Sequence, residues 1–219
     1  MTDQNLDWLT TPSICLFSAA PKSGKTYMIE FIIKTLWAEQ RFSYGFIFSM
    51  TALNNGDYDY LPRRYIYGQY DDKKLGAIMQ HQRNKGGPNA PPAFIVFDDC
   101  LGAAQFNSAV FTQLVTTYRH MNLTLFITTQ YVFKVPPVFR DCCTFAFIFK
   151  QGTMKSMKAL WETFGSMFFS KYADWAKFVN RYTQKFGVLV AKTQSEVVLR
   201  ERFMHIKAPP NLPQFDLNY

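Results

Sequence analysis

The chain has 219 residues, 48% of them hydrophobic and 18% charged, and its formal net charge is +8. These values exclude a disordered chain and suit a single folded domain over residues 1–219. No apolar run approaches the roughly 20 residues of a membrane helix, and the N-terminus lacks the basic start and apolar core of a signal peptide. We therefore expect a soluble protein that has no membrane span and is not secreted. Its four cysteines lack metal-binding spacing, which indicates reduced thiols.

The first informative segment is SICLFSAAPKSGKTYMIEFI, from Ser13 to Ile32. Strand-forming residues lead into a small-residue loop that ends in Gly-Lys-Thr, and a helix-forming stretch follows. This order is typical of a phosphate-binding loop (P-loop), whose backbone N–H groups and following helix N-terminus face the phosphates of a nucleoside triphosphate. Lys25 is expected to reach the β and γ phosphates, and Thr26 to bind Mg²⁺. The expected nucleotide-binding residues are Ala19, Ala20, Pro21, Lys22, Ser23, Gly24, Lys25, Thr26 and Tyr27.

One position departs from the usual G-x-x-x-x-G-K-[ST] pattern, because Ala19 replaces its first glycine. Alanine disfavours positive φ more strongly than glycine does, so we expect a negative φ at the start of the loop. A chance Gly-Lys-Thr in an ordinary loop is the alternative interpretation, and the flanking strand and helix argue against it.

The elements expected next are a helix over 26–40, a strand over 44–50, a short strand over 65–67, a helix over 71–83 and an irregular linker over 84–92. A second motif, AFIVFDDC, then runs from Ala93 to Cys100. Its continuous apolar run indicates a parallel strand buried on both faces. Asp98 suits the outer shell of Mg²⁺, and Asp99 suits a base that activates water. An Asp-Asp pair can also simply begin a helix or turn, but its place about 70 residues after a P-loop favours the metal and base roles.

A third motif combines a helix over 106–121, with Phe106, Val110, Leu114 and Tyr118 on one face, and the strand LTLFITTQ from Leu123 to Gln130. In a parallel sheet the active site lies at the carboxyl ends of the strands. Gln130 therefore stands where its amide could hold a water or sense the γ phosphate. A polar residue at a strand end is ordinarily just the start of a loop, so this assignment depends on the other two motifs.

The segments SAAPKSGKT, FIVFDDC, TYRHMNLTLFITTQ and VPPVFRDC, in this order and spacing, resemble the genome-packaging ATPases of double-stranded DNA viruses of the poxvirus and giant-virus type, within the FtsK/HerA superfamily. The resemblance covers roughly residues 13–150. It implies an ATP- and Mg²⁺-dependent motor, a homo-oligomeric ring of five or six subunits, that pushes double-stranded viral DNA into a preformed capsid. It further implies a capsid or portal-vertex protein as partner, and work in the host cytoplasm or a virus factory, with association with the virion as a further option.

The resemblance also implies that a neighbouring subunit supplies an arginine finger. Arg119 is the first candidate, because it closes a helix at the rim of the sheet just before the strand that carries Gln130. Arg140, in VPPVFRDC, is the second and could act as a sensor within its own subunit. The simpler interpretation of Arg119 is a cation that interacts with a helix dipole.

The C-terminal part is expected to contain a strand over 144–150, two helices, strands over 187–192 and 196–203 that can pair as a hairpin, and an extended tail. Together the elements predict an α/β three-layer sandwich of the P-loop NTPase type, RecA/FtsK-like, with a mainly parallel central sheet. Its core covers about 13–150, a basic extension about 151–207, and the tail 208–219.

The net positive charge is concentrated in residues 150–219, which contain 11 basic and 5 acidic residues. The basic residues singled out are Lys155, Lys158, Lys171, Lys177, Arg181 and Lys185. The aromatic residues among them are Trp161, Phe168, Tyr172, Trp175 and Tyr182. One interpretation is a face that neutralises DNA phosphates without reading bases. The other is a pair of amphipathic helices with core aromatics and solvated lysines.

Two other functions remain open at this stage. A small-molecule or nucleotide kinase would also begin with a P-loop, but it needs several arginines at an acceptor site, and Arg63 and Arg64 are the only arginine pair. A DNA-associated P-loop protein without turnover is the second alternative, motivated by Ala19.

Overall fold

The computed structural model describes residues 6–193 and 199–212. Its centre is one eight-stranded sheet in the order β3-β2-β4-β5-β1-β6-β7-β8. Six strands are parallel: β1 (Ile14–Ser18), β2 (Tyr44–Ser49), β3 (Ile66–Tyr67), β4 (Ala93–Asp98), β5 (Leu123–Thr129) and β6 (Phe145–Ile148). The last two strands pair in antiparallel fashion: β7 (Val188–Lys192) is antiparallel to β6, and β8 (Phe203–Ile206) is antiparallel to β7.

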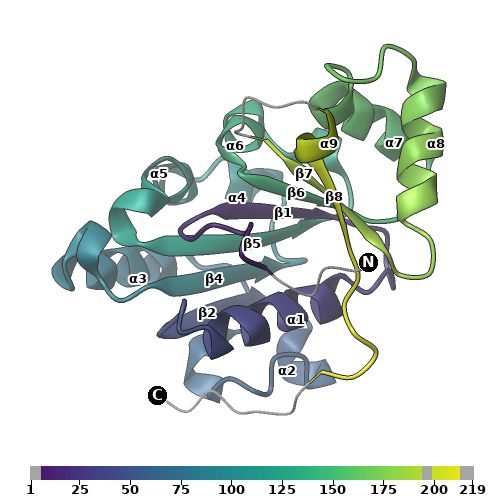
Figure 1. Ribbon diagram of the computed structural model, residues 1–219. Coiled ribbons are helices and arrows are strands. Elements are labelled where there is room, and N and C mark those ends of the chain that lie inside the picture. The colour runs from purple at the N-terminus through teal and green to yellow at the C-terminus, as the bar shows by residue number, and fades with distance from the viewer. Residues whose placement is uncertain (1–5, 194–198, 213–219) are drawn as a thin grey trace.

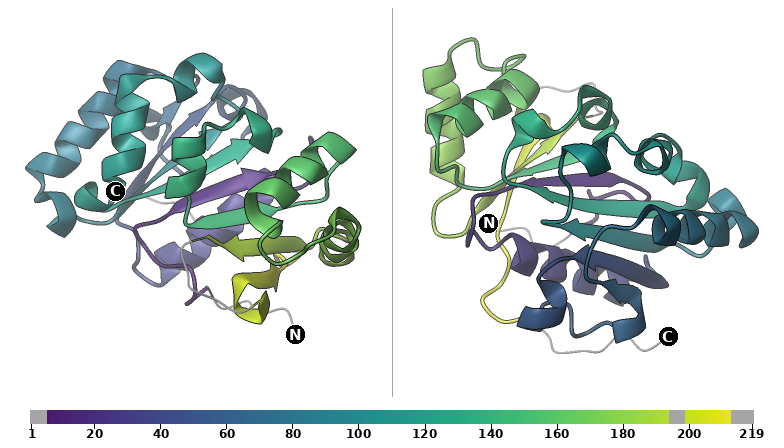
Figure 2. Two further views of the ribbon diagram at one scale, coloured as in Figure 1. Left: turned by 90° about the horizontal axis from the view of Figure 1, so that it is seen from above. Right: turned by 180° about the vertical axis from the view of Figure 1, so that it is seen from behind.

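The helices of the described residues cover both faces of this sheet. They are α1 (Lys25–Ala38), α2 (Ala52–Asn55), α3 (Asp72–Asn84), α4 (Ala103–Phe106), α5 (Ala109–Thr117), α6 (Pro137–Cys142), α7 (Met154–Leu160), α8 (Tyr172–Tyr182) and α9 (Leu199–Arg202). Helix α1 lies along one face, and α3, α5 and α6 lie along the other (Figures 1 and 2). The predicted three-layer α/β sandwich with a mainly parallel sheet is confirmed.

Alternation along the strands fills two separate cores. In β1, Ile14 and Leu16 pack towards α5 and α6, whereas Cys15 and Phe17 pack towards α1. All five residues of β1 are buried, as expected for a parallel strand covered on both faces. Because β1 lies between β5 and β6, the loop that follows it opens at the middle of the carboxyl edge. That edge is where parallel α/β sheets bind ligands.

Most predicted elements have the predicted bounds within two residues, and two do not. The helix expected over 106–121 is interrupted: α4 ends at Phe106, α5 begins at Ala109, and a 3₁₀ turn covers Tyr118–Met121. The Ser108 hydroxyl accepts a hydrogen bond from the Phe111 N–H (3.3 Å) and caps α5, which explains the new start. A short 3₁₀ turn, Gly87–Asn89, also lies inside the linker expected to be irregular.

The strand expected over 196–203 is wrong in its bounds. Residues 194–198 lie outside the described part, Leu199–Arg202 form α9, and the strand is Phe203–Ile206. The expected pairing with the preceding strand is nevertheless present, because β7 and β8 are antiparallel neighbours. The extended tail therefore begins after Ile206; residues 207–212 run past α1, where the Tyr27 hydroxyl donates to the Pro209 carbonyl (2.8 Å) (Figure 1). Residues 213–219 of the tail lie outside the description.

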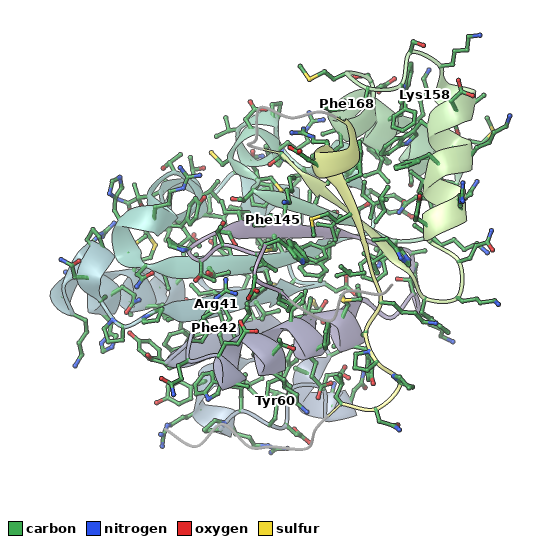
Figure 3. The ribbon with its side chains drawn as sticks, in the orientation of Figure 1. Arg41, Phe42, Tyr60, Phe145, Lys158 and Phe168 are labelled. Atoms are coloured by element: carbon green, nitrogen blue, oxygen red, sulfur yellow. The ribbon has the colours of Figure 1, made fainter. Side chains whose placement is uncertain are left out.

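The outer lobe, which we define as α7, the π-helical turn Trp161–Gly165 and α8, lies beside the β6–β8 end of the sheet (Figure 1). Its aromatic residues belong to the core: Trp175 is fully buried, and Phe168 packs edge-on against Phe203. Its predicted basic residues are exposed, and Figure 3 shows Lys158 on this lobe. The aromatic rings of the lobe thus lie in the core and its basic side chains are exposed. Both interpretations of this region, a DNA-binding face and a pair of amphipathic helices, fit this arrangement.

Neither membrane helices nor disulfides occur in the described residues. None of the helices over 6–193 and 199–212 is long and apolar enough to cross a membrane. All four cysteines are free thiols, as expected, and Cys15 and Cys143 are buried.

Candidate nucleotide-binding site

The loop after β1 has the backbone of a phosphate cradle. Left-handed conformations occur at Lys22 (φ 59°) and Gly24 (φ 86°), and Gly24 caps the N-terminus of α1. Ala19 keeps a negative φ, as predicted, and its N–H donates to the Thr129 carbonyl (3.1 Å). Alanine at position 19 is therefore compatible with this loop, because the positive φ angles of the loop occur at Lys22 and Gly24.

The charge cluster at the site joins the first motif to the second. The Lys25 ammonium contacts the Asp99 carboxylate directly and lies 3.9 Å from the nearer oxygen of Asp98. The Lys25 side chain is only 10% exposed, so its charge is satisfied by the two aspartates rather than by water. A triphosphate placed in the loop would compete with these carboxylates for the same ammonium group.

Asp98 is the most heavily hydrogen-bonded group of the site. It accepts from the hydroxyls of Thr128 (2.9 Å), Tyr58 (3.0 Å) and Thr26 (3.3 Å). Burial raises the pKa of its carboxyl above the usual aspartate value, and the Lys25 ammonium acts in the opposite direction. Three hydroxyl donors and one ammonium fix this carboxylate beside Thr26, and a carboxylate with a hydroxyl is a donor set that suits Mg²⁺.

Asp99 differs from Asp98 in backbone and exposure. Its φ of 49° turns the chain out of β4, and its side chain is 38% exposed. The Thr128 hydroxyl accepts from the Asp99 N–H (2.9 Å), which holds this turn in place. Asp99 therefore faces the solvent side of the site while Asp98 faces the interior, and their roles as base and metal ligand stay predictions.

A cavity of 550 Å³ opens beside Asp99. Gln130, the third predicted catalytic group, lines it together with Thr128, Thr129 and Lys134. The three motifs, separated by about a hundred residues of sequence, are thus brought to one edge of the sheet.

The two arginines lie elsewhere. Arg119 belongs to the 3₁₀ turn before β5, at the amino edge of the sheet, where its Nε donates to the Tyr118 hydroxyl (2.9 Å). Arg140 lies in α6 and donates to the Thr163 hydroxyl (3.2 Å) in the π-helical turn. The structure thus does not bring either arginine into the Lys25–Asp99 cluster of its own chain, because Arg119 lies before β5 and Arg140 contacts the π-helical turn. A role at a neighbour's site stays a prediction.

Two residues of the site were not found from the sequence. Thr128 stands inside an apolar strand, and its unusual polarity in LTLFITTQ is a signal that could have been used. Tyr58 comes from a loop before β3 and gave no signal. The remaining predicted binding residues, Ala20 to Ser23, form one wall of a second cavity, and Tyr27 is turned towards Pro209.

No protein-family model matches the chain. The uncharacterised protein 088R of Invertebrate iridescent virus 3 is 26% identical over 122 residues, which are 54% of this chain and 47% of that protein. An uncharacterised protein of Acanthamoeba polyphaga mimivirus is 25% identical over 175 residues, 74% of this chain and 60% of that protein. The chain thus spans about half the length of the curated relatives that it matches.

Solved structures share the fold at low identity. The genome packaging NTPase B204 of Sulfolobus turreted icosahedral virus 2, in complex with AMPPCP, has a TM-score of 0.67 at 16% identity, with 92% of this chain and all of that chain covered. The pCW3 conjugation coupling protein TcpA has a TM-score of 0.62 at 10% identity, with 95% of this chain and 61% of that chain covered. The chain thus shares the fold of these solved proteins, a viral genome packaging NTPase among them, and this agrees with the resemblance stated from the sequence motifs.

Proposed function

We propose that this chain is an ATPase that drives double-stranded viral DNA into a preformed capsid. The observation that carries the proposal is the cluster of Lys25, Thr26, Asp98, Asp99 and Gln130 at the carboxyl edge of the sheet. It combines a phosphate-binding cation, a metal-binding pair and a candidate base around one loop. Work in the host cytoplasm or a virus factory follows from the proposed task.

The proposed roles follow from the burial of each group. Lys25 would leave the aspartates for the β and γ phosphates, and Asp99 would then be free to accept a proton from water. Thr26 and Asp98 would hold Mg²⁺, which neutralises phosphate charge when bound. Gln130, on the wall of the cavity beside Asp99, would position the attacking water.

The DNA part of the proposal is supported by the outer lobe. Its lysines are exposed while its aromatic rings serve the core, so the lysines are available for phosphate contacts. A ring of five or six copies, a capsid or portal-vertex partner, and Arg119 as the finger of the neighbouring subunit belong to the same proposal.

The kinase alternative is less well supported. The arginine pair that could bind an acceptor phosphate, Arg63 and Arg64, lies in the 3₁₀ turn before β3, at the amino edge of the sheet. The P-loop is at the opposite edge. The non-hydrolysing alternative was motivated by Ala19, whose negative φ and hydrogen bond to Thr129 leave the loop able to form.

A phosphate-release assay with ATP and Mg²⁺, with and without double-stranded DNA, tests the proposal. The motor should hydrolyse ATP and be stimulated by DNA, and Lys25→Ala should abolish both binding and turnover. Lys73→Ala, which removes an exposed lysine from α3, is the matched control and should change neither. Hydrolysis without stimulation would remove the DNA part of the proposal. Binding of ATP without any hydrolysis would favour the non-hydrolysing alternative, and phosphate transfer to a small molecule would favour the kinase.

A further inference from the structure

Exposed apolar side chains gather in two places on this molecule. Of the nine large apolar residues that are exposed in the described part of the chain, six lie in the segment after β2 or in the segments after β5 and β6. They are Met50, Leu53, Tyr131, Phe133, Val138 and Met154. Exposed apolar side chains that cluster beside polar ones mark contact surfaces for another protein.

The first of these places carries negative charge. We define the acidic surface as Met50, Leu53, Asp57 and Asp59, all in the segment between β2 and β3. Residues 50–62 contain no lysine or arginine. Neither carboxylate belongs to an ion pair among the described residues. Two uncompensated negative charges therefore lie beside two exposed apolar side chains.

The second place carries positive charge. We define the basic surface as Tyr131, Phe133, Lys134, Val138, Met154 and Lys155. The aromatic rings of Tyr131 and Phe133 lie 5.4 Å apart. The Lys134 ammonium is 5.1 Å from the centre of the Tyr131 ring, and the Lys155 ammonium is 4.5 Å from that of Phe133. Residues 131–140 and 149–161 contain no acidic residue, so the charge of this surface is positive throughout.

The two surfaces lie at the same edge of the sheet but on opposite faces. Both follow the carboxyl ends of parallel strands. The buried neighbours of the acidic surface pack on the α1 side, whereas those of the basic surface pack on the side of α5 and α6. Figure 1 shows α2 below the sheet with α1, and α7 on the other side. Because the sheet separates them, the two surfaces cannot meet within one chain.

We propose that the acidic surface of one copy binds the basic surface of the next copy, so that copies associate head to tail; the inference rests on the proposed ring of subunits and names the surfaces that form it. Apolar side chains with opposite charges beside them are the complementary chemistry of a protein interface. A contact between two copies of the same surface would instead bring like charges together. Contacts between two different surfaces close into a ring when the rotation between copies allows it.

The test reverses the charges and measures the mass of the assembly by analytical ultracentrifugation, with and without ADP and Mg²⁺. Asp57→Lys with Asp59→Lys reverses the acidic surface, and Lys134→Glu with Lys155→Glu reverses the basic one. Each double variant should raise the dissociation constant between copies about 10- to 1,000-fold, because like charges then face each other. A chain with all four substitutions should associate as the unaltered protein does, because its surfaces are complementary again.

Two further variants separate the contact from the fold and from total charge. Lys73→Glu with Lys85→Glu makes the same change of charge at exposed positions of α3 and its end, and should leave association unchanged. Met154→Ser changes a side chain that is 77% exposed and not needed for the core, and should weaken association about 3- to 30-fold. The melting temperature of each variant is measured alongside.

Unchanged association in both double variants would overturn the inference, and so would a fourfold variant that folds normally but does not associate. An unaltered protein that stays a monomer at every concentration would contradict both the inference and the proposed ring. An unaltered protein that assembles through these surfaces but neither binds nor hydrolyses ATP would contradict the proposed function alone.

Discussion

The parallel part of the sheet and its antiparallel edge differ in how far their charged side chains are exposed to solvent. At the ends of β1, β4 and β5, Asp98 is 3% exposed and is held by three hydroxyls and the Lys25 ammonium. In the outer lobe beside β7 and β8, the lysines are exposed and the aromatic rings below them are packed. Hydrolysis benefits from preorganised groups shielded from water. Binding of a charged polymer needs accessible cations whose effect depends on salt.

This difference gives the two regions different expected sensitivities. A substitution at the carboxyl ends of the parallel strands should alter the rate of ATP hydrolysis by orders of magnitude, because each side chain there has a fixed place. A change at the antiparallel edge should alter affinity gradually, because each lysine contributes alone.

The largest effect is expected for Arg119→Ala. If Arg119 acts at a neighbour's γ phosphate, its loss should lower turnover about 10³- to 10⁵-fold while ATP still binds. Adding an excess of Lys25→Ala subunits, which keep Arg119, should partly restore hydrolysis at mixed interfaces, as measured by phosphate release. Arg83→Ala is the matched control, because this exposed arginine ends α3 at the same edge of the sheet. A mixture that assembles normally but stays inactive would exclude Arg119 as the finger, and the same experiment would then be done with Arg140→Ala.

A smaller but still large effect is expected for Asp99→Asn. Loss of the base should lower turnover about 10²- to 10⁴-fold. ATP should bind at least as well as before, because Lys25 is no longer held by a full charge at Asp99. Asp98→Asn should instead weaken the Mg²⁺-dependent part of binding. Calorimetry with and without Mg²⁺ distinguishes the two variants, and loss of binding in Asp99→Asn would mean that the roles of the aspartates are reversed.

The sequence predicted the parallel region better than the antiparallel one, for physical reasons. Strands buried on both faces are continuous apolar runs, and polar residues at their ends converge because parallel strands share one carboxyl edge. That geometry placed Lys25, Asp98 and Gln130 together. Near the antiparallel edge, the pattern over 196–203 fits a strand, yet the structure has α9 there and the strand at Phe203–Ile206.

Contacts between distant loops were the other limit of sequence reasoning. Tyr58 reaches Asp98 from 40 residues away, and nothing in its local pattern indicates this. Gly187, in the loop between α8 and β7, lies so close to His205 that an added Cβ would come within 2.6 Å of its ring, and this tertiary contact has no local sequence signal. The sequence at Ser108 is typical of a helix N-cap. The apolar face expected over Phe106 and Leu114 nevertheless predicted one continuous helix, and so the break before Ser108 was not predicted.

At the antiparallel edge, Lys158, Lys171 and Lys177 replaced together by Gln should weaken DNA binding for all sequences alike. The slope of log affinity against log salt should become shallower by up to about 0.9 for each lost phosphate contact. Replacing Lys73, Lys74 and Lys85 by Gln removes the same charge near α3, at the other end of the sheet, and should leave the slope unchanged (Figure 1). Equal slopes for both triple variants would show that the outer lobe is ordinary solvated surface. The measurement is a salt titration of binding to short duplexes of two unrelated sequences.

The smallest expected effect concerns His205 of β8, whose ring lies beside Gly187 in the loop before β7. Partial burial lowers the pKa of His205 below its usual value, Lys207 adds to this, and a hydrogen bond with the Tyr182 backbone opposes it. The folded protein therefore takes up the proton less readily than the unfolded chain does. Its free energy of unfolding should be fully retained above the ordinary histidine pKa of about 6.5 and should fall as the pH drops through that value. Urea unfolding at several pH values measures this slope, and His205→Gln should reduce it. An identical slope in the variant would mean that other groups titrate, and that the antiparallel edge contributes no pH sensitivity through this ring.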